Sequence, residues 1–89
     1  MAIREETTEK LRELGFHVLP STTNFILAGH PGLPGKTLYQ GLRERGILVR
    51  HFGREDIKDY VRITIGTKEQ MDTLVEQTAL LLKEVQNNG

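Results

Sequence analysis

Cysteine is absent from the 89 residues, which excludes a disulfide framework and thiolate metal sites. An excess of either charge is also absent, because 12 basic residues balance 12 acidic ones, whereas nucleic-acid-binding domains are usually basic. No apolar run approaches the roughly 20 residues that a membrane helix needs, and the first residues lack the apolar centre of a secretory signal. These absences predict a cytoplasmic domain that binds neither nucleic acid nor membrane.

The chain length predicts one domain over residues 1–89, with a thin two-layer core. Segments with helical and strand-like hydrophobic periods alternate, separated by glycine and proline. We expect helices over residues 2–14 and 36–45 and after Thr67, and strands over residues 16–19, 23–28, 47–52 and 60–66. Thr67 and Gln70 have the spacing of a capping box for the last helix. The order αββαββα predicts an α+β two-layer sandwich: an antiparallel or mixed sheet of about four strands with helices on one face.

Two familiar site patterns fail on their spacing. The segment GKT after a Gly-rich loop is similar to a nucleotide-binding loop, but the position that requires glycine holds His30. The histidines His17, His30 and His51 do not follow a metal-ligand spacing such as H-x-x-x-H. The sequence therefore predicts neither a nucleotide-hydrolysis site nor a metal site.

Two arginines stand within the last two predicted strands. In YVRITI, alternation places Arg62 on the face opposite Val61 and Ile63, and ILVRHF carries Arg50. A hairpin register symmetric about Asp56 would put Arg50 directly across from Arg62, although like charges directly opposed on a sheet are destabilising. An anion between them would remove the repulsion, because guanidinium forks bind carboxylate or phosphate bidentately. Arginines that simply point into water explain the pattern equally well.

Three segments together resemble the C-terminal small domain of histidinol-phosphate aminotransferases, which are pyridoxal-phosphate enzymes of the aspartate-aminotransferase fold type. They are NFIL after a Pro-Ser turn, L-x-x-x-G-I-x-V-R, and RITIGT before an acidic amphipathic helix. The resemblance covers nearly the whole chain. It implies that Arg62 and Arg50 bind the acidic end of the substrate and that Asn24 lies near the site. From the residues alone, Asn24 is only a capping or turn amide.

The resemblance also implies what a whole enzyme needs. Pyridoxal 5'-phosphate would be held by a Schiff-base lysine in a large domain, and that domain is absent from this chain. We therefore expect no catalytic residue, no bound cofactor and no transaminase activity in the chain alone. The implied partners are a phosphorylated amino substrate, the large domain and a second subunit of a homodimer. Loss of the large domain is expected to expose apolar surface around Leu33, Leu48 and Phe52.

Two other interpretations remain open at this point. A threonine-phosphate decarboxylase has the same fold type, and its substrate also carries an anionic group, so the arginines do not separate the two enzymes. A free-standing module that binds a small molecule or another protein is the second alternative, because a two-layer α+β fold does not fix function. Such a module would bind phosphate or an amino acid unaided.

Overall fold

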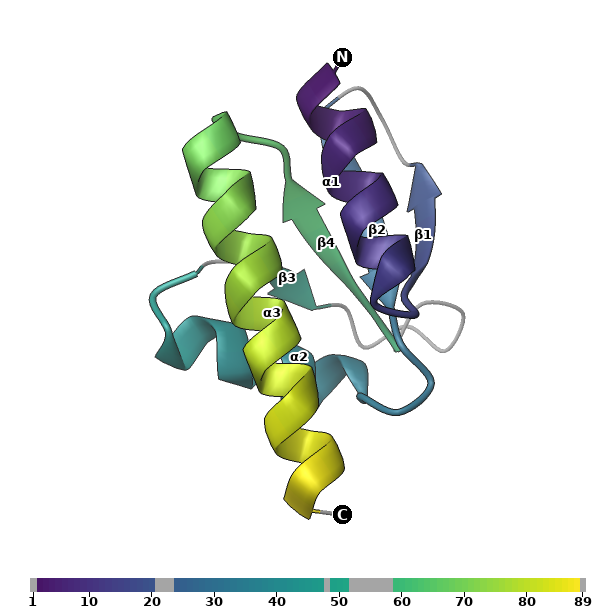
Figure 1. Cartoon of the computed structure of the whole chain (residues 1–89), viewed down its shortest axis with the longest axis vertical. Helices are drawn as coiled ribbons and strands as arrows, with labels where there is room; N and C mark the ends of the chain where they lie inside the picture. Colours follow the sequence, from purple (N-terminus) through teal and green to yellow (C-terminus); the bar gives the residue numbers. More distant parts are fainter. Residues whose placement is uncertain (1, 21–23, 48, 52–58, 89) are drawn as a thin grey trace.

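The computed structural model describes residues 2–20, 24–47, 49–51 and 59–88. Within this part of the chain the elements follow the predicted order αββαββα (Figure 1). They are α1 (Ala2–Glu13), β1 (His17–Pro20), β2 (Phe25–Gly29), α2 (Gly35–Glu44), β3 (Arg50–His51), β4 (Tyr60–Thr64) and α3 (Lys68–Asn88). The predicted α+β class is confirmed.

The strands form one antiparallel sheet in the order β1-β2-β4-β3. Two hairpin-like pairs, β1 with β2 and β3 with β4, therefore meet at the central pair β2 and β4. Helices α1 and α3 lie side by side across one face of the sheet (Figure 1). Helix α2 packs against α3, β3 and β4. This arrangement settles the choice between an antiparallel and a mixed sheet in favour of the antiparallel one.

Helices α1 and α2 end in the same glycine turn, which determines where the following strands begin. Gly15 and Gly46 have φ angles of +94° and +78°, a region that glycine adopts without steric penalty. In each turn the next residue, Phe16 or Ile47, donates its N–H to the carbonyl five residues back, at 3.1 and 2.9 Å. Because these donors close the helices, β1 begins one residue later than predicted, and Ile47 is not part of β3.

Strand β3 is therefore shorter than the predicted 47–52 segment. Its described residues are Arg50 and His51 alone, and Leu48 and Phe52 lie outside the described residues. The expected exposure of Leu48 and Phe52 is thus not addressed by the structure.

The core fills the space between the sheet and the helices. Buried strand residues alternate with residues on the other face, as a half-buried sheet requires. The core comprises Leu11, Phe16, Val18, Ile26, Ala28, Leu33, Leu38, Leu42, Val49, Val61, Ile63, Met71, Leu74, Leu81 and Leu82. Helix α2 approaches α3 closely at Gly41, where an added Cβ would lie 2.5 Å from Leu81 Cδ2.

The expectation that Leu33 is exposed was wrong, because its side chain is fully buried. The Leu33 N–H closes a turn by donating to the His30 carbonyl at 3.0 Å. Pro34 is the N-cap of α2, so Leu33 and Leu38 occupy the two positions of a hydrophobic staple, and both are buried. The glycine- and proline-rich segment therefore serves to fold Leu33 back into the core.

Helix α3 begins with the predicted capping box. The Gln70 N–H donates to Thr67 Oγ1 at 3.1 Å, and the Thr67 N–H donates to Gln70 Oε1 at 2.9 Å. Each side chain therefore satisfies a backbone donor that the first helical turn leaves unpaired. Among the described residues, neither this 21-residue helix nor any other is long and apolar enough to cross a membrane.

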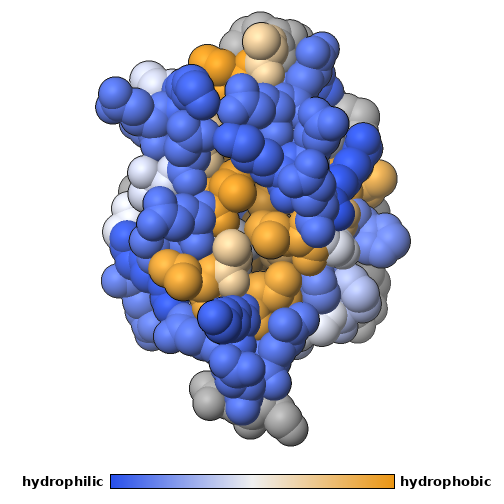
Figure 2. All heavy atoms as spheres, in the orientation of Figure 1, coloured by the Kyte–Doolittle hydropathy of each residue, from blue (hydrophilic) through white to orange (hydrophobic). Residues whose placement is uncertain are grey.

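Four charged side chains join α1 to α3 across the outer surface. Lys10 Nζ lies 2.9 Å from Glu6 Oε1 and 3.2 Å from Asp72 Oδ1, and Lys68 Nζ lies 3.2 Å from each of the same carboxylates. The hydrogen bonds from the lysines lower the pKa of Glu6 and Asp72, and the carboxylates raise the pKa of Lys10 and Lys68. On this helical side, hydrophilic side chains surround the apolar atoms that remain visible (Figure 2).

Candidate anion-binding site

Arg50 of β3 stands directly opposite Arg62 of β4 in the sheet. This is the register that symmetry about Asp56 would give, which the sequence alone left open. Val61 and Ile63, the sequence neighbours of Arg62, are buried on the helical side, so alternation places Arg62 on the other face. Arg50 shares that face because directly opposed residues project to the same side. The two guanidinium groups therefore belong to one sheet surface.

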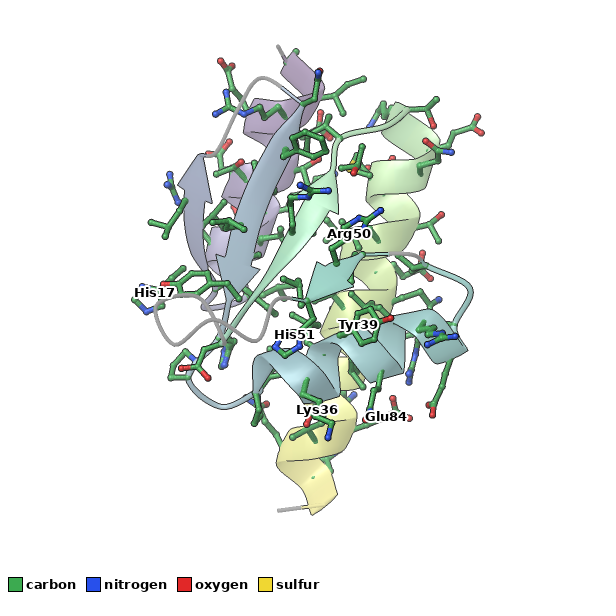
Figure 3. All side chains as sticks on the ribbon, turned by 180° about the vertical axis from the view of Figure 1, so that it is seen from behind. His17, Lys36, Tyr39, Arg50, His51 and Glu84 are labelled. Atoms are coloured by element: carbon green, nitrogen blue, oxygen red, sulfur yellow. The ribbon has the colours of Figure 1, made fainter. Side chains whose placement is uncertain are left out.

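That surface is the one that the helices leave open. Seen from behind, β1, β2 and β4 lie in front of α1 and α3, and Arg50 extends from β3 beside them (Figure 3). The side chain of Arg50 is exposed and that of Arg62 is half-buried. Both side chains lie on the sheet face opposite the core.

The two arginines complete a row of four residues that crosses the whole sheet. Leu19 of β1 pairs with Leu27 of β2, Leu27 pairs with Arg62, and Arg62 pairs with Arg50. Neighbouring side chains in such a row have Cβ atoms about 4.5–5.5 Å apart. Leu19 is 46% exposed, so the row is open and apolar at one end and cationic at the other. A ligand with an apolar body and an anionic end matches this order.

Arg62 is in contact with an aromatic ring. Its Cζ atom lies over the ring of Phe25, 4.4 Å from the ring centroid. Phe25 begins β2 and pairs with Thr64, two residues along β4 from Arg62, so the contact is a diagonal cross-strand pair. Both residues are half-buried. The ring attracts the cation electrostatically, and it constrains where the guanidinium can lie.

Asn24 lies at the start of β2, at the end of the sheet where β4 leads into α3. Its carbonyl accepts the Ile65 N–H at 2.8 Å, which extends the β2–β4 ladder by one step. Leu27, the partner of Arg62, is three residues further along β2, a separation of roughly 10 Å in an extended strand. Asn24 is exposed, and its contact with a substrate stays a prediction.

The histidines lie in three different surroundings. His51 is on the helical side, opposite Val61, and its ring centroid is 6.2 Å from that of Tyr39 on α2 (Figure 3). His30 accepts a backbone N–H at Nδ1, and His17 is exposed on β1. Within the described ranges, no group of three or more His, Cys, Asp or Glu side chains is placed to hold a metal ion.

The structure also has a hollow of about 550 Å³ near the start of α3. It lies between the first turns of α3 and the segment that follows α2, and Val49 and Ile63 form part of its lining. Those two side chains belong to the buried, helical side of the sheet. Thr64, two residues from Arg62 and therefore on the same face of β4, also lines the hollow.

Comparison with known sequences identifies the family to which the chain belongs. The family model for class I and II aminotransferases matches residues 2–77, and the chain belongs to this family. A histidinol-phosphate aminotransferase from Chromohalobacter salexigens is 49% identical over 73 residues, which are 82% of this chain and 21% of that relative. A histidinol-phosphate aminotransferase from Syntrophus aciditrophicus is 50% identical over 74 residues, 83% of this chain and 20% of that relative.

A solved structure shows the same fold. A candidate aminotransferase from Burkholderia pseudomallei K96243 superposes with a TM-score of 0.77 at 34% identity, over 91% of this chain and 24% of that one. The resemblance that the sequence motifs indicated is thus confirmed at the level of the family. The chain spans about a fifth of the length of the two curated relatives.

The described lysines do not form a site for the cofactor that this family uses. Carboxylates hold the pKa of Lys10 and Lys68 above its ordinary value, whereas a Schiff-base lysine needs a lowered pKa. Lys36 and Lys83 are exposed on α2 and α3. The surroundings of these four described lysines therefore differ from those of a Schiff-base lysine.

Phe25 is the residue of this surface whose role the sequence analysis missed. Strand alternation puts Phe25 and Leu27 on the face opposite the buried Ile26. Together with the pairing of β2 and β4, that alternation would have located the ring near Arg62. Pairing between these strands was not predicted, because they are separated by α2 and β3 in the sequence.

Proposed function

We propose that this chain is the substrate-positioning part of a pyridoxal-phosphate-dependent aminotransferase that acts on histidinol phosphate. Arg62 and Arg50 bind the phosphate of the substrate, and Asn24 lies at the edge of the same site. The observation that carries the proposal is the direct pairing of Arg50 with Arg62 on the open sheet face. The matched relatives named as histidinol-phosphate aminotransferases support this choice of substrate over threonine phosphate.

The arginines contribute binding and orientation. Each guanidinium presents N–H donors in a planar fork that fits two oxygens of a phosphate. Two forks from adjacent strands spread the negative charge over two cations and fix the direction of the substrate. Holding the substrate in one orientation lowers the entropic part of the barrier to reaction. The leucines of the same row lie where an apolar part of a ligand would rest.

The remaining parts of the reaction belong to polypeptide outside these residues. The cofactor supplies the electron sink for moving the amino group. In our proposal it is held by a large domain, and the complete enzyme is a cytoplasmic homodimer. Residues 1–89 form a single domain that closes the site over the substrate, as mobile elements do in many enzymes.

A chimeric enzyme tests this proposal. The 73 matched residues of the Chromohalobacter salexigens relative are replaced by the corresponding residues of this chain, and transamination of histidinol phosphate is measured. We expect an active enzyme. Arg62→Gln should lower kcat/KM for histidinol phosphate by roughly 30-fold or more, because truncating one partner of a hydrogen-bonded charge pair costs about 2–5 kcal/mol.

Histidinol without its phosphate is the matched control substrate. Arg62→Gln and Arg50→Gln should lower kcat/KM much less for histidinol than for histidinol phosphate. An equal loss on both substrates would show that the arginines do not bind the phosphate. An inactive chimera that is folded and binds cofactor would count against the positioning role of this domain.

The isolated chain provides a second test. With pyridoxal phosphate, histidinol phosphate and 2-oxoglutarate added, we expect no turnover above background in a coupled assay. Turnover would contradict the proposal, because it would require a cofactor-binding lysine in this chain. Tight binding of an amino acid by the isolated chain, rather than weak binding of phosphate alone, would favour the free-standing binding module instead.

A further inference from the structure

We propose that Phe25 is a positioning residue for the anion site: its ring holds the Arg62 guanidinium where it can bind a phosphate together with Arg50. The inference rests on the proposed function and adds the residue that sets the geometry of the cationic pair. Its basis is the 4.4 Å separation between Arg62 Cζ and the Phe25 ring centroid. That distance is well within the roughly 6 Å over which a cation and a ring attract each other.

The contact with Phe25 does not itself use the N–H donors of Arg62. An aromatic ring attracts a guanidinium through the negative charge of its π face. The N–H donors of the guanidinium lie in the guanidinium plane and bind oxygens at its edges. The Phe25 ring accepts no conventional hydrogen bond, so it restrains the Arg62 side chain without using the donors that a phosphate needs.

The strand order determines the direction in which the Phe25 ring attracts the Arg62 guanidinium. β4 lies between β2 and β3, so Phe25 is on one side of Arg62 and Arg50 is on the other. Attraction to the ring draws the Arg62 guanidinium toward β2. It thereby offsets the repulsion between directly opposed like charges and holds the Arg62 guanidinium away from Arg50.

Graded fluorination of the Phe25 ring is the most direct test, because fluorine weakens the negative π face while nearly preserving ring size. The 89-residue chain is prepared with one, two, three and five ring fluorines at residue 25, and inorganic phosphate is titrated while the arginine Nε–Hε signals are followed by NMR. We expect phosphate affinity to fall stepwise with each added fluorine. Affinity that is independent of fluorine number would overturn the proposal, because a ring that only fills space is insensitive to this change.

Substitutions with ordinary genetically encoded amino acids extend the test. Phe25→Leu should weaken phosphate binding about two- to fivefold, the range expected for a cation–π contact at a partly exposed site. Phe25→Tyr keeps the ring and should restore wild-type affinity. Tyr60→Leu removes an aromatic side chain from the same face of β4 and should leave phosphate affinity unchanged. Equal losses in Phe25→Leu and Tyr60→Leu would contradict a specific role for Phe25.

Arginine variants separate failure of this inference from failure of the proposed function. If Arg62→Gln abolishes phosphate binding while all Phe25 variants bind as the wild type does, the anion site stands and the role of Phe25 is wrong. If Arg62→Gln and Arg50→Gln both bind phosphate like the wild type, the anion site itself is wrong, and the inference fails with it.

Discussion

The two faces of the sheet carry different kinds of residue. On the helical face, aliphatic side chains such as Val18, Ile26 and Val61 are buried against α1 and α3. On the opposite face, one row combines two leucines with two directly opposed arginines. Burial of aliphatic groups stabilises the fold, whereas opposed like charges weaken it. The difference supports our proposal that one face stabilises the fold and the other binds the ligand.

If that division holds, a core variant should affect stability and spare binding. Leu42→Ala removes a fully buried side chain of α2 and should lower the free energy of unfolding by about 2–5 kcal/mol, through lost burial and a residual cavity. Urea denaturation measures the loss. The phosphate affinity of the folded protein should be unchanged, and a parallel loss of affinity would show that the two faces are coupled.

A change in helix packing should have the next largest effect. Gly41→Ala places a Cβ 2.5 Å from Leu81 Cδ2, and we expect a loss of about 1–3 kcal/mol from overpacking. The Leu81→Ala exchange makes room for the new methyl group. The double variant should therefore be more stable than the sum of the two single losses predicts, and simple additivity in the urea measurements would rule out the close contact.

On the open face, stability and binding should change in opposite directions. Arg50→Ala removes one of two opposed like charges, so the free energy of unfolding should stay the same or rise by about 0.2–1 kcal/mol. Phosphate affinity should fall. Urea is the appropriate denaturant here, because guanidinium chloride screens charges. A clear loss of stability would mean that Arg50 supports the fold rather than a ligand.

The smallest effect is expected on the outer surface of the helices. The lowered pKa of Glu6 and Asp72 means that their stabilising contribution is present above the unfolded-state pKa and is lost as the pH falls through the folded-state values. The raised pKa of Lys10 and Lys68 means that their contribution is lost only at high pH, as the pH rises through the folded-state values. The four groups are exposed, so solvent and salt screen the effect.

Glu6→Gln should therefore flatten the dependence of urea stability on pH below about 5, and it should reduce the effect of salt. Glu9→Gln, on the same helix but outside the four-residue cluster, is the control. Identical pH profiles for the two variants would contradict a contribution from the cluster.

Local signals in the sequence predicted most of the fold. The capping box of Thr67 and Gln70 was predicted correctly because both of its residues lie within one turn. The pairing of Arg50 with Arg62 was considered because those strands are consecutive in the sequence, but alternation alone did not fix the register. The end of a helix was harder to place: Ile47 has strand propensity, but its N–H is used to close α2.

Residues that depend on contacts distant in the sequence were not predicted. Leu33 was expected at the surface because the large domain is missing, yet the turn after His30 carries it into the core. The contact of Phe25 with Arg62 depends on the pairing of β2 with β4, and no local pattern specifies that pairing. The lysine environments likewise depend on the packing of α1 against α3.

The position of Pro20 has a consequence for how the molecule behaves in concentrated solution. β1 is an outer strand that pairs only with β2, and Pro20 ends it. A proline has no N–H to offer to an added strand. This margin of the sheet is therefore a poor template for growth into larger β-assemblies.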